Sequence, residues 1–501
     1  MEKYNDTPWI PRDIEKDFQY LASFNIKRKA FWVSGLNKVG KTTLLTKFGK
    51  ESFRKFHVLD LTDKEQRVRA ERAFSKALSV IGGTAYDKRY ASAALKNCIE
   101  GFDDSPDEFL LIDEIQESEH LYNLARWIVR GLDAKVCFVG SFLGDTINWE
   151  RANIPAGDVM CLDVLPVTYG EFVRSIDDLE KYRAVRDFTG TNPDPVLYDP
   201  KPYWDTFYEL GGFPQPLAAS LTGDKAKALK MQDLELNDFV ESVQEKTQGN
   251  LPLSVWKNLL GYTILAILCH KDPTDLDNLK LIKEPAEYPA TTFLEMVHKL
   301  MSWMKGSSIL TCVPVIDRLD VLKPFLISKC EFTNYWVLSK LVEVSGNLDL
   351  KCADVKTDTF VLNELRHLNS LCPNISLCNY VLDGKHVGFL FFTKEGARVL
   401  VEAEKSGTET FVHWDMAVEP PDFFIRLTKG TGFAQGCRIE IPIWHMDRLP
   451  IIMGLIDIAY TNDMTLEKAY KRYTNGIEDK VIKNPDSDDY WTFDGDASYG
   501  L

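Results

Sequence analysis

Residues 31–43 read Phe31-Trp32-Val33-Ser34-Gly35-Leu36-Asn37-Lys38-Val39-Gly40-Lys41-Thr42-Thr43. An apolar run that reads as a strand ends at Ser34, and the pattern Gly-x-x-x-x-Gly-Lys-Thr follows it. Leu44, Leu45 and Phe48 then come at helical spacing, so the pattern lies between a strand and a helix, as a P-loop requires. The stretch predicts an α/β fold in which this loop holds a phosphate group.

The glycines and the lysine of this stretch suit phosphate binding. Gly35 and Gly40 let the backbone turn so that its N–H groups line a concave surface, and the helix starting at Lys41 adds the positive end of its dipole. We expect Lys41 to reach the β- and γ-phosphates of ATP, and the Thr42 hydroxyl to bind Mg²⁺. The expected nucleotide-binding residues are Gly35, Lys38, Val39, Gly40, Lys41, Thr42 and Thr43. The alternative is a glycine-containing turn between a strand and a helix, but residue types, spacing and context together favour nucleotide binding.

The composition is that of an ordinary globular protein. Of 501 residues, 45% are hydrophobic and 27% are charged, and this length predicts about two to four domains. The formal charge of −15 gives no overall support for binding a nucleic-acid polyanion, although a local basic groove stays compatible with it. The ten cysteines include no Cys-x-x-Cys pair, which favours reduced thiols over disulfides or zinc. Residues 1–6 lack an apolar signal core, and the longest apolar run, near 262–269, is too short for a bilayer, so we expect a cytoplasmic protein with no membrane partner.

A second motif ends an apolar run with two carboxylates. Residues 108–116 read Glu108-Phe109-Leu110-Leu111-Ile112-Asp113-Glu114-Ile115-Gln116, which predicts a buried parallel strand. Ligands of open α/β sheets lie at the carboxyl ends of the strands, so Asp113 is expected to hold Mg²⁺, directly or through water. Glu114 is expected to orient and polarise the attacking water. The alternative is a solvated acidic turn, which the upstream P-loop makes the weaker interpretation.

Other apolar runs supply the rest of a sheet. Residues 135–141 predict a strand whose polar end, Ser141, would lie near the γ-phosphate as a sensor, although a plain strand end explains this serine almost equally well. Residues 56–61 and 158–165 also read as strands. Because these strands alternate with helical stretches, residues 1–175 are predicted to form a P-loop ATPase core with a parallel, doubly wound sheet.

The order and spacing of the motifs across residues 10–220 resemble a prokaryotic AAA-type ATPase family that carries a C-terminal domain related to PD-(D/E)XK nucleases. The matching motifs are residues 35–43, 111–116, 140–141, 165–172 and 211–214. The resemblance implies a Mg²⁺-dependent ATPase, and we expect its catalytic residues to be Lys41, Glu114 and Ser141, with Thr42 and Asp113 at the metal.

Two positions depart from the pattern of that family. Asn37 and Asp158 stand where it usually has arginines, and the second of these arginines would be expected to stabilise charge in the transition state. Arg151 is close enough in sequence to substitute, although a surface arginine is the simpler interpretation. The departures bear on ATP turnover more than on ATP binding.

Beyond residue 175 the segments are assigned mainly by resemblance. Residues 176–250 are predicted to form a helical lid over the nucleotide. Residues 251–330 are predicted to be winged-helix-like, because two apolar helical faces precede short strands near 309–313 and 326–327. A winged helix binds DNA in some proteins and only protein partners in others, so DNA, a protein partner and a second copy of the chain all stay open.

Residues 331–410 are the predicted nuclease-like α/β domain, with Glu364 on a helix. An active nuclease of this kind needs an Asp at a strand end and Glu-x-Lys on the next strand, because the carboxylates hold metal ions and the Lys steadies developing charge. Here Gly388 stands at the Asp position, and Lys405 follows Glu402 one place late. We therefore expect a degenerate, inactive domain, followed by a C-terminal extension with an acidic tail over residues 411–501.

Three functions are compatible with these features. The first is a Mg²⁺-dependent ATPase that acts as a molecular switch for its appended domains. The second is an ATP-gated nucleic-acid-binding protein or nuclease, and the third is a non-hydrolysing nucleotide-binding interaction protein. The acidic balance and the broken nuclease positions favour the first and third. No base-reading motif separates ATP from GTP.

Overall fold

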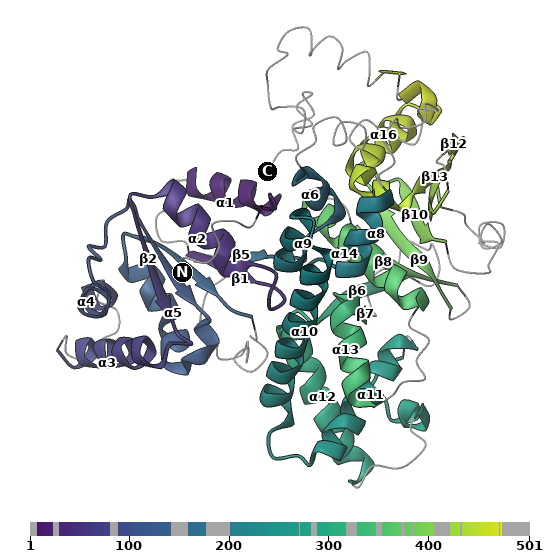
Figure 1. Ribbon diagram of the computed structural model, residues 1–501. Helices are drawn as coiled ribbons and strands as arrows, with labels where there is room; N and C mark the ends of the chain where they lie inside the picture. Colours follow the sequence, from purple (N-terminus) through teal and green to yellow (C-terminus); the bar gives the residue numbers. More distant parts are fainter. Residues whose placement is uncertain are drawn as a thin grey trace.

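The computed structural model describes most of the chain and gives the fold in two sheets joined by helices (Figure 1). The described residues are 8–23, 30–80, 89–141, 159–176, 201–269, 271–281, 288–316, 328–346, 353–371, 376–382, 385–404, 421–430, 433–469 and 471–472.

The first sheet has five parallel strands in the order β2-β3-β4-β1-β5. Its strands are β1 (Ala30–Ser34), β2 (Lys55–Asp60), β3 (Glu108–Asp113), β4 (Lys135–Val139) and β5 (Val159–Asp163). Its helices are α1 (Ile14–Ser23), α2 (Lys41–Ser52), α3 (Lys64–Val80), α4 (Arg89–Cys98) and α5 (Glu119–Gly131). The predicted parallel α/β core is confirmed, and because all five strands run the same way, the residues after β1, β3 and β4 meet at one edge.

Alternate strand residues build a core on each face of this sheet. Val33 packs on one face with Leu45 of α2, whereas Trp32 packs on the other with Phe74 of α3 and Ile128 of α5. The apolar run of β3 is buried along its whole length, as expected for a strand covered on both sides. The sheet edge that carries the P-loop is thus fixed by two apolar layers.

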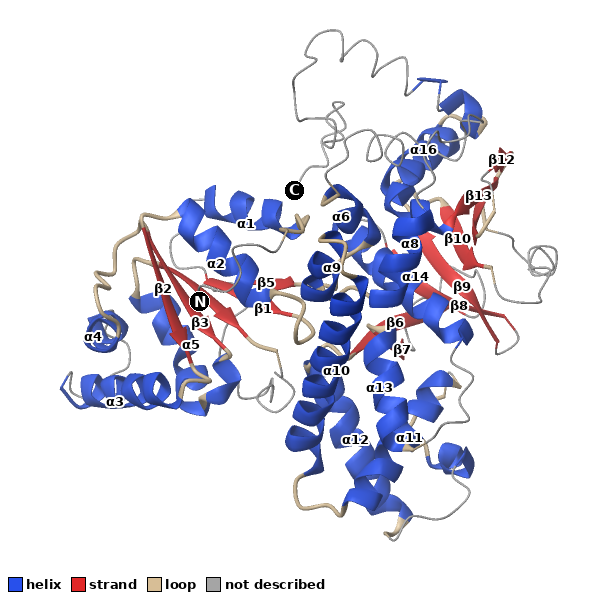
Figure 2. Cartoon of the chain, viewed as in Figure 1, coloured by secondary structure: helices blue, strands red, loops and turns tan. Residues whose placement is uncertain are grey.

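A helical middle section follows β5 (Figure 2). It comprises α6 (Tyr169–Arg174), α8 (Lys201–Leu210), α9 (Pro214–Leu221), α10 (Lys225–Gln248), α11 (Leu253–Leu268) and α12 (Ala290–Gly306). Helix α10 packs against α9 and against α13 (Tyr335–Ser345). Helices α6, α8 and α9 share an apolar cluster with the second sheet, so the segment predicted as a lid is packed against the C-terminal part.

The second sheet has eight strands in the order β12-β13-β11-β10-β9-β8-β6-β7. They are β6 (Leu310–Ile316), β7 (Ser328–Phe332), β8 (Ser376–Leu382), β9 (Lys385–Phe392), β10 (Arg398–Ala403), β11 (Phe423–Thr428), β12 (Phe433–Gln435) and β13 (Arg438–Pro442). Helices α14 (Ala353–Leu371) and α16 (Leu449–Thr461) contribute to the apolar cluster on one face, with η4 (Ile443–Arg448) beside them.

A hairpin of β6 and β7 lies near the expected wing, although residues 326–327, expected as its second strand, lie outside the described residues. Strands β6 and β7 pair antiparallel, yet β6 also pairs with β8, so the two strands form one border of the eight-stranded sheet. Pairing of this kind is set by residues far apart in sequence, which local patterns do not reveal. The sheet runs across the boundaries expected at 330 and 410, and the finer division into lid, winged-helix-like and nuclease-like domains stays a prediction.

The length and hydropathy of the helices in the described ranges bear on whether the chain could cross a membrane. No single helix there is both long and apolar enough to cross a bilayer. Only α10 and α11 taken together reach that length and composition, and they are bent by 107° at their junction.

Candidate nucleotide site

The P-loop backbone has the shape that its glycines suggested. Gly35 has φ +138°, and a Cβ there would lie 2.3 Å from the Val164 carbonyl oxygen, so only glycine fits. Gly40 has φ +91° at the N-terminus of α2, and Lys38 has φ +69°. The left-handed residues at positions 38 and 40 curl the chain into a concave nest of N–H groups, which is the geometry that binds phosphate.

Lys41 is buried within the loop that it would serve. Its Nζ donates to the carbonyl oxygens of Gly35 and Leu36, at 2.9 Å each, and the residue is 4% exposed. Burial lowers the pKa of Lys41 to about 8, against the opposing charges of Glu114, Asp163 and Asp113. A phosphate group would offer this ammonium stronger acceptors than the two carbonyls do.

Thr42 and Asp113 lie together, as the metal hypothesis requires. Thr42 Oγ1 donates to Asp113 Oδ2 at 2.8 Å. Burial raises the pKa of Asp113 to about 6, although the Thr42 hydrogen bond opposes the rise. A hydroxyl at the start of α2 and a carboxylate at the end of β3 are the hard oxygen ligands that Mg²⁺ takes beside nucleotide phosphates, so the residues fit this ion.

Glu114 is held by the residue that was predicted as a sensor. Its backbone is left-handed, with φ 51°, and its two carboxylate oxygens accept from Ser141 Oγ at 2.5 Å and from Ser141 N at 3.1 Å. Gln116 Nε2 also donates to this carboxylate. Ser141 is 3% exposed, so β4 positions Glu114 at the edge where Asp113 and Lys41 lie.

The structure therefore joins the predicted catalytic and metal residues into one constellation. Gly35, Lys38, Val39, Gly40 and Thr43 complete the loop around Lys41, with Thr43 exposed. Asp158 and Arg151, the positions considered for a charge-stabilising arginine, lie outside the described residues, as does Lys405.

A buried arginine that the sequence did not reveal binds the backbone of the P-loop. Arg12 donates to Glu171 Oε2 at 2.9 Å, to the Val39 carbonyl at 3.1 Å and to the Leu165 carbonyl at 2.6 Å. Glu171 also closes a capping box with Thr168 at the start of α6. Arg12 is 6% exposed, and its partners explain why an acidic residue occurs in the motif 165–172.

Three residues of α14 contact the domain that carries the P-loop, or the segment before it. Glu364 Oε1 accepts from Tyr169 N at 3.0 Å, and Arg366 donates to Asp163 Oδ2 at 3.0 Å. His367 Nε2 lies 3.0 Å from Asp13 Oδ2. No local pattern reveals these contacts, because the partners are between 195 and 354 positions away.

The Asp13 contact belongs to an ion-pair cluster. Burial would raise the pKa of Asp13, but hydrogen bonds from His367 and Arg174 hold it well below its usual value. Asp13, Glu171 and His367 are close enough to share a cation. Arg12 and Arg174 already supply the positive charge that these carboxylates need, so the cluster is explained without a metal.

Helix α10 reaches the other side of the P-loop. Lys38 Nζ lies 3.6 Å from Asp238, and Lys246 Nζ lies 2.9 Å from Glu117, which follows the Asp113-Glu114 turn. Burial raises the pKa of Glu235 on the same helix to about 7, with the charge of Lys38 opposing the rise. These contacts place acidic groups of α10 beside the loop that would bind the nucleotide.

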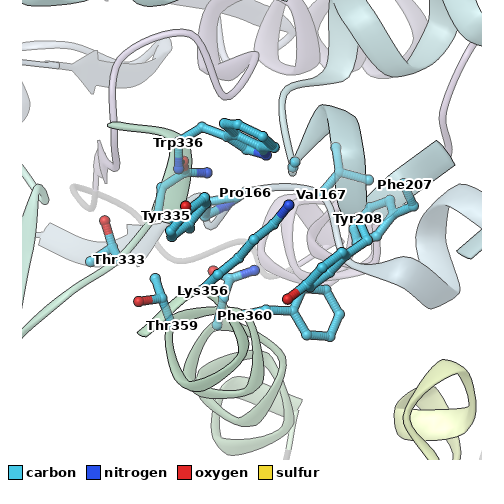
Figure 3. Close-up of a pocket in the computed structure, with 14 residues that line it drawn as sticks. Pro166, Val167, Phe207, Tyr208, Thr333, Tyr335, Trp336, Lys356, Thr359 and Phe360 are labelled. Atoms are coloured by element: carbon cyan, nitrogen blue, oxygen red, sulfur yellow. The ribbon is translucent and has the colours of Figure 1, made fainter. Parts of the chain in front are cut away.

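A small pocket lies where α8, α13 and α14 meet the segment after β5 (Figure 3). In it, Lys356 Nζ lies 4.0 Å from the ring centre of Tyr208 and 4.3 Å from that of Trp336. Burial lowers the pKa of Lys356 to about 8. Gly211, with φ +71°, permits this packing, because a Cβ there would lie 2.3 Å from Trp336 Cδ1. The Gly-Gly-Phe-Pro motif thus serves as a contact point for the C-terminal helices.

The predicted nuclease positions do not form a comparable site. A Cβ on Gly388 would lie 2.5 Å from the Val401 carbonyl oxygen and 3.4 Å from Glu402 Cα. The close approach of β10 leaves no room there for an aspartate. Glu364 lies on a helix as expected, but it is buried and accepts the hydrogen bond from Tyr169.

Comparison with known families gives one match. Residues 27–173 match the family model described as AAA domain. These residues contain the five-stranded sheet, the P-loop and the Asp113-Glu114 motif. For this segment, the prediction of an AAA-type P-loop domain is confirmed. No curated protein matches the chain in sequence.

Several solved structures are similar at low identity. The Walker-type ATPase PABY2304 of Pyrococcus abyssi is 16% identical, with a TM-score of 0.40, covering 66% of this chain and 96% of that one. The ORC2 protein of Aeropyrum pernix is 12% identical, with a TM-score of 0.36, covering 68% and 95%. DnaA from Aquifex aeolicus, bound to AMPPCP, is 12% identical, with a TM-score of 0.25, covering 58% and 87%. At these sequence identities and TM-scores, the similarities establish neither the fold of the whole chain nor its function.

Proposed function

We propose that this protein is a Mg²⁺-dependent ATPase whose nucleotide state controls its C-terminal part. The observation that carries the proposal is the pair of contacts Thr42–Asp113 and Glu114–Ser141 beside the buried Lys41. Hydrolysis of a nucleotide needs a phosphate cradle, a metal ligand set and a group that orients water, and the sheet edge brings all three together.

Each residue has a defined task in this proposal. Lys41 exchanges the carbonyls of Gly35 and Leu36 for the phosphate oxygens, while Thr42 and Asp113 hold Mg²⁺. When bound, the ion supplies positive charge that offsets the charge developing on the phosphates. Glu114 accepts a proton from the attacking water, and Ser141 fixes its carboxylate in place.

The contacts of α14 support the switch in this proposal. Glu364, Arg366 and His367 all contact residues of the P-loop domain or of the segment before it. The same helix contributes Val361 and Leu365 to the core of the second sheet. A change in position at β5 or α6 would therefore move a helix that is part of the C-terminal core.

An assay of phosphate release tests the ATPase. We expect Lys41→Ala to abolish ATP binding, and Glu114→Gln to retain binding while hydrolysis falls by about 10²–10³-fold. The matched control is Lys50→Ala, which removes an exposed lysine from the same helix and should behave as wild type. Hydrolysis retained by Lys41→Ala would refute the proposal.

The same assay separates the remaining alternatives. Wild-type protein that binds ATP without hydrolysing it, with DNA, RNA or a protein partner added, would favour the non-hydrolysing interaction protein. Strong stimulation by DNA or RNA would favour the ATP-gated nucleic-acid-binding protein or nuclease. GTP in a parallel reaction decides the base preference. A cytoplasmic location, a protein partner and self-association stay predictions.

A further inference from the structure

Two cysteines face each other on the β6–β7 hairpin. Cys312 on β6 and Cys330 on β7 are direct partners in the antiparallel register, and their Sγ atoms lie 3.9 Å apart. Strand β7 is at the border of the second sheet, and Cys312 is exposed. The pair is therefore reachable from solvent, unlike the buried thiols of Cys98, Cys137 and Cys378.

The position of the pair in the ladder suits a disulfide. Thr333 N donates to the Ile309 carbonyl at 3.1 Å, which marks 309/333 as a hydrogen-bonded pair. Pairs alternate along an antiparallel ladder, so 312/330 is a non-hydrogen-bonded pair, the kind with the closer Cα atoms, about 4.5 Å apart. Disulfides span Cα separations of roughly 4.4–6.8 Å, so rotation of the two side chains suffices to bring the sulfurs together.

The charges around the pair distinguish the two thiols. The hydrogen bond with Cys330 and the nearby Lys305 ammonium lower the pKa of Cys312 to about 6. The hydrogen bond with Cys312 and burial raise the pKa of Cys330 above its usual value. Cys312 is the more exposed of the two thiols, and the lowered pKa favours it over Cys330 as the one that ionises.

We propose that Cys312 and Cys330 are a peroxide-reactive thiol pair that forms a reversible disulfide, with Cys312 reacting first. The Cys312 thiolate attacks one oxygen of hydrogen peroxide, so an S–O bond forms, the O–O bond breaks, and hydroxide leaves and takes up a proton as water. The Cys330 sulfur then attacks Cys312 Sγ, so the S–S bond forms, the S–O bond breaks and a second water leaves. In sum, two thiols and one peroxide give one disulfide and two waters.

The order of the two steps follows from charge. Oxidation of Cys312 to the neutral sulfenic acid removes the negative charge that disfavours a Cys330 thiolate, while Lys305 continues to favour it. The second thiol therefore becomes a better nucleophile only after the first has reacted.

The experiment treats the full chain with hydrogen peroxide, blocks the remaining thiols with an alkylating reagent and maps peptides by mass spectrometry without reduction. We expect a linked Cys312–Cys330 peptide pair, lighter than the two thiol peptides by about 2 Da and separated again by dithiothreitol. In Cys330→Ser, Cys312 should accumulate a sulfenic acid that dimedone traps. In Cys312→Ser, Cys330 should stay reduced at the same peroxide dose.

Matched controls separate this chemistry from general oxidation. Cys269 is also exposed, so Cys269→Ser should leave the yield of the 312–330 link unchanged. Lys305→Met should slow alkylation of Cys312 several-fold, and this rate is read in the reduced protein without disulfide formation. The proposal is overturned if no linked peptide forms, or if Cys269 and Cys312 oxidise at equal rates.

Discussion

Arg366 neutralises a carboxylate beside the P-loop, although it lies 203 residues from that carboxylate in sequence. Asp163 ends β5, pairs in register with Ser34 and lies 3.5 Å from the Ser34 hydroxyl. Without Arg366, the negative charge of Asp163 would face the incoming phosphates. We expect Arg366→Ala to weaken ATP binding by about five- to tenfold through this repulsion.

A double-mutant cycle measured by ATP titration checks the explanation. Asp163→Asn alone should bind ATP nearly as wild type does, and adding it to Arg366→Ala should restore most of the lost affinity. The loss should also shrink at high salt, since the charges are partly exposed. If the double variant binds as poorly as Arg366→Ala, the arginine acts in some other way than by neutralising Asp163.

Asp113 gives the site a pH dependence whose direction can be worked out. Burial raises the pKa of this carboxyl from 3.8 to about 6, so in the folded protein it holds a proton to a higher pH than in the unfolded chain. Mg²⁺ needs the ionised form. Mg²⁺-dependent ATP binding should therefore fall by about tenfold per pH unit as the pH drops below the pKa of Asp113.

The matched measurement is ATP binding in EDTA, which should change much less over the same range. The free energy of unfolding depends on pH in the opposite direction: it falls as the pH rises, because ionisation of a buried carboxyl opposes folding. Between pH 3.8 and about 6, wild type should lose stability relative to Asp113→Asn as the pH rises. A Mg²⁺-dependent affinity that stays constant from pH 7.5 to 5 would contradict the assignment of Asp113 to the metal.

At the scale of elements, local patterns decided what could be predicted. The strand before Gly35, helix α2 and strand β3 follow from apolar runs and spacing within about 15 residues, and all three are as expected. The pairing of β6 with β8 leaves no such trace, since it depends on contacts between distant segments. Arg12 and Arg366 were missed for the same reason, because an isolated arginine shows its buried partner only in three dimensions.

Gly388 stands where an active nuclease would have an aspartate, and the packing of the second sheet requires a glycine at this position. A side chain there would press on the Val401 carbonyl of β10. We expect Gly388→Ala to lower the free energy of unfolding by about 1–3 kcal/mol, measured by urea titration with tryptophan fluorescence.

The control for this prediction is Gly430→Ala, two residues beyond the end of β11, where the nearest atom to a new Cβ is Thr428 Oγ1 at 3.7 Å. That variant should stay within about 0.5 kcal/mol of wild type. Equal stability of Gly388→Ala and wild type would mean that β9 and β10 can separate, and the steric explanation for the absent aspartate would fail.

At the scale of the whole molecule, α14 contacts both halves of the described structure. Its residues Glu364, Arg366 and His367 contact Tyr169, Asp163 and Asp13, while its apolar side packs into the second sheet. The polar contacts come from one turn of helix, so they form or break together more readily than scattered contacts would. Through these contacts, the proposed switch would pass a change at the P-loop domain to the C-terminal core.

Hydrogen exchange tests whether nucleotide binding at the P-loop changes the stability of α14. ATP with Mg²⁺ should change amide exchange in the α14 peptide covering residues 360–371, and Lys41→Ala should show no change. In His367→Ala, ATP should still bind while the response of α14 shrinks, because one of the three contacts is gone. Strand β12, at the opposite border of the second sheet from β7, is the internal control, since a general gain in stability would slow its exchange as well. Unchanged exchange in α14 at saturating ATP would leave the ATPase intact but would remove α14 as its output, because a helix that couples two sites must differ between the two nucleotide states.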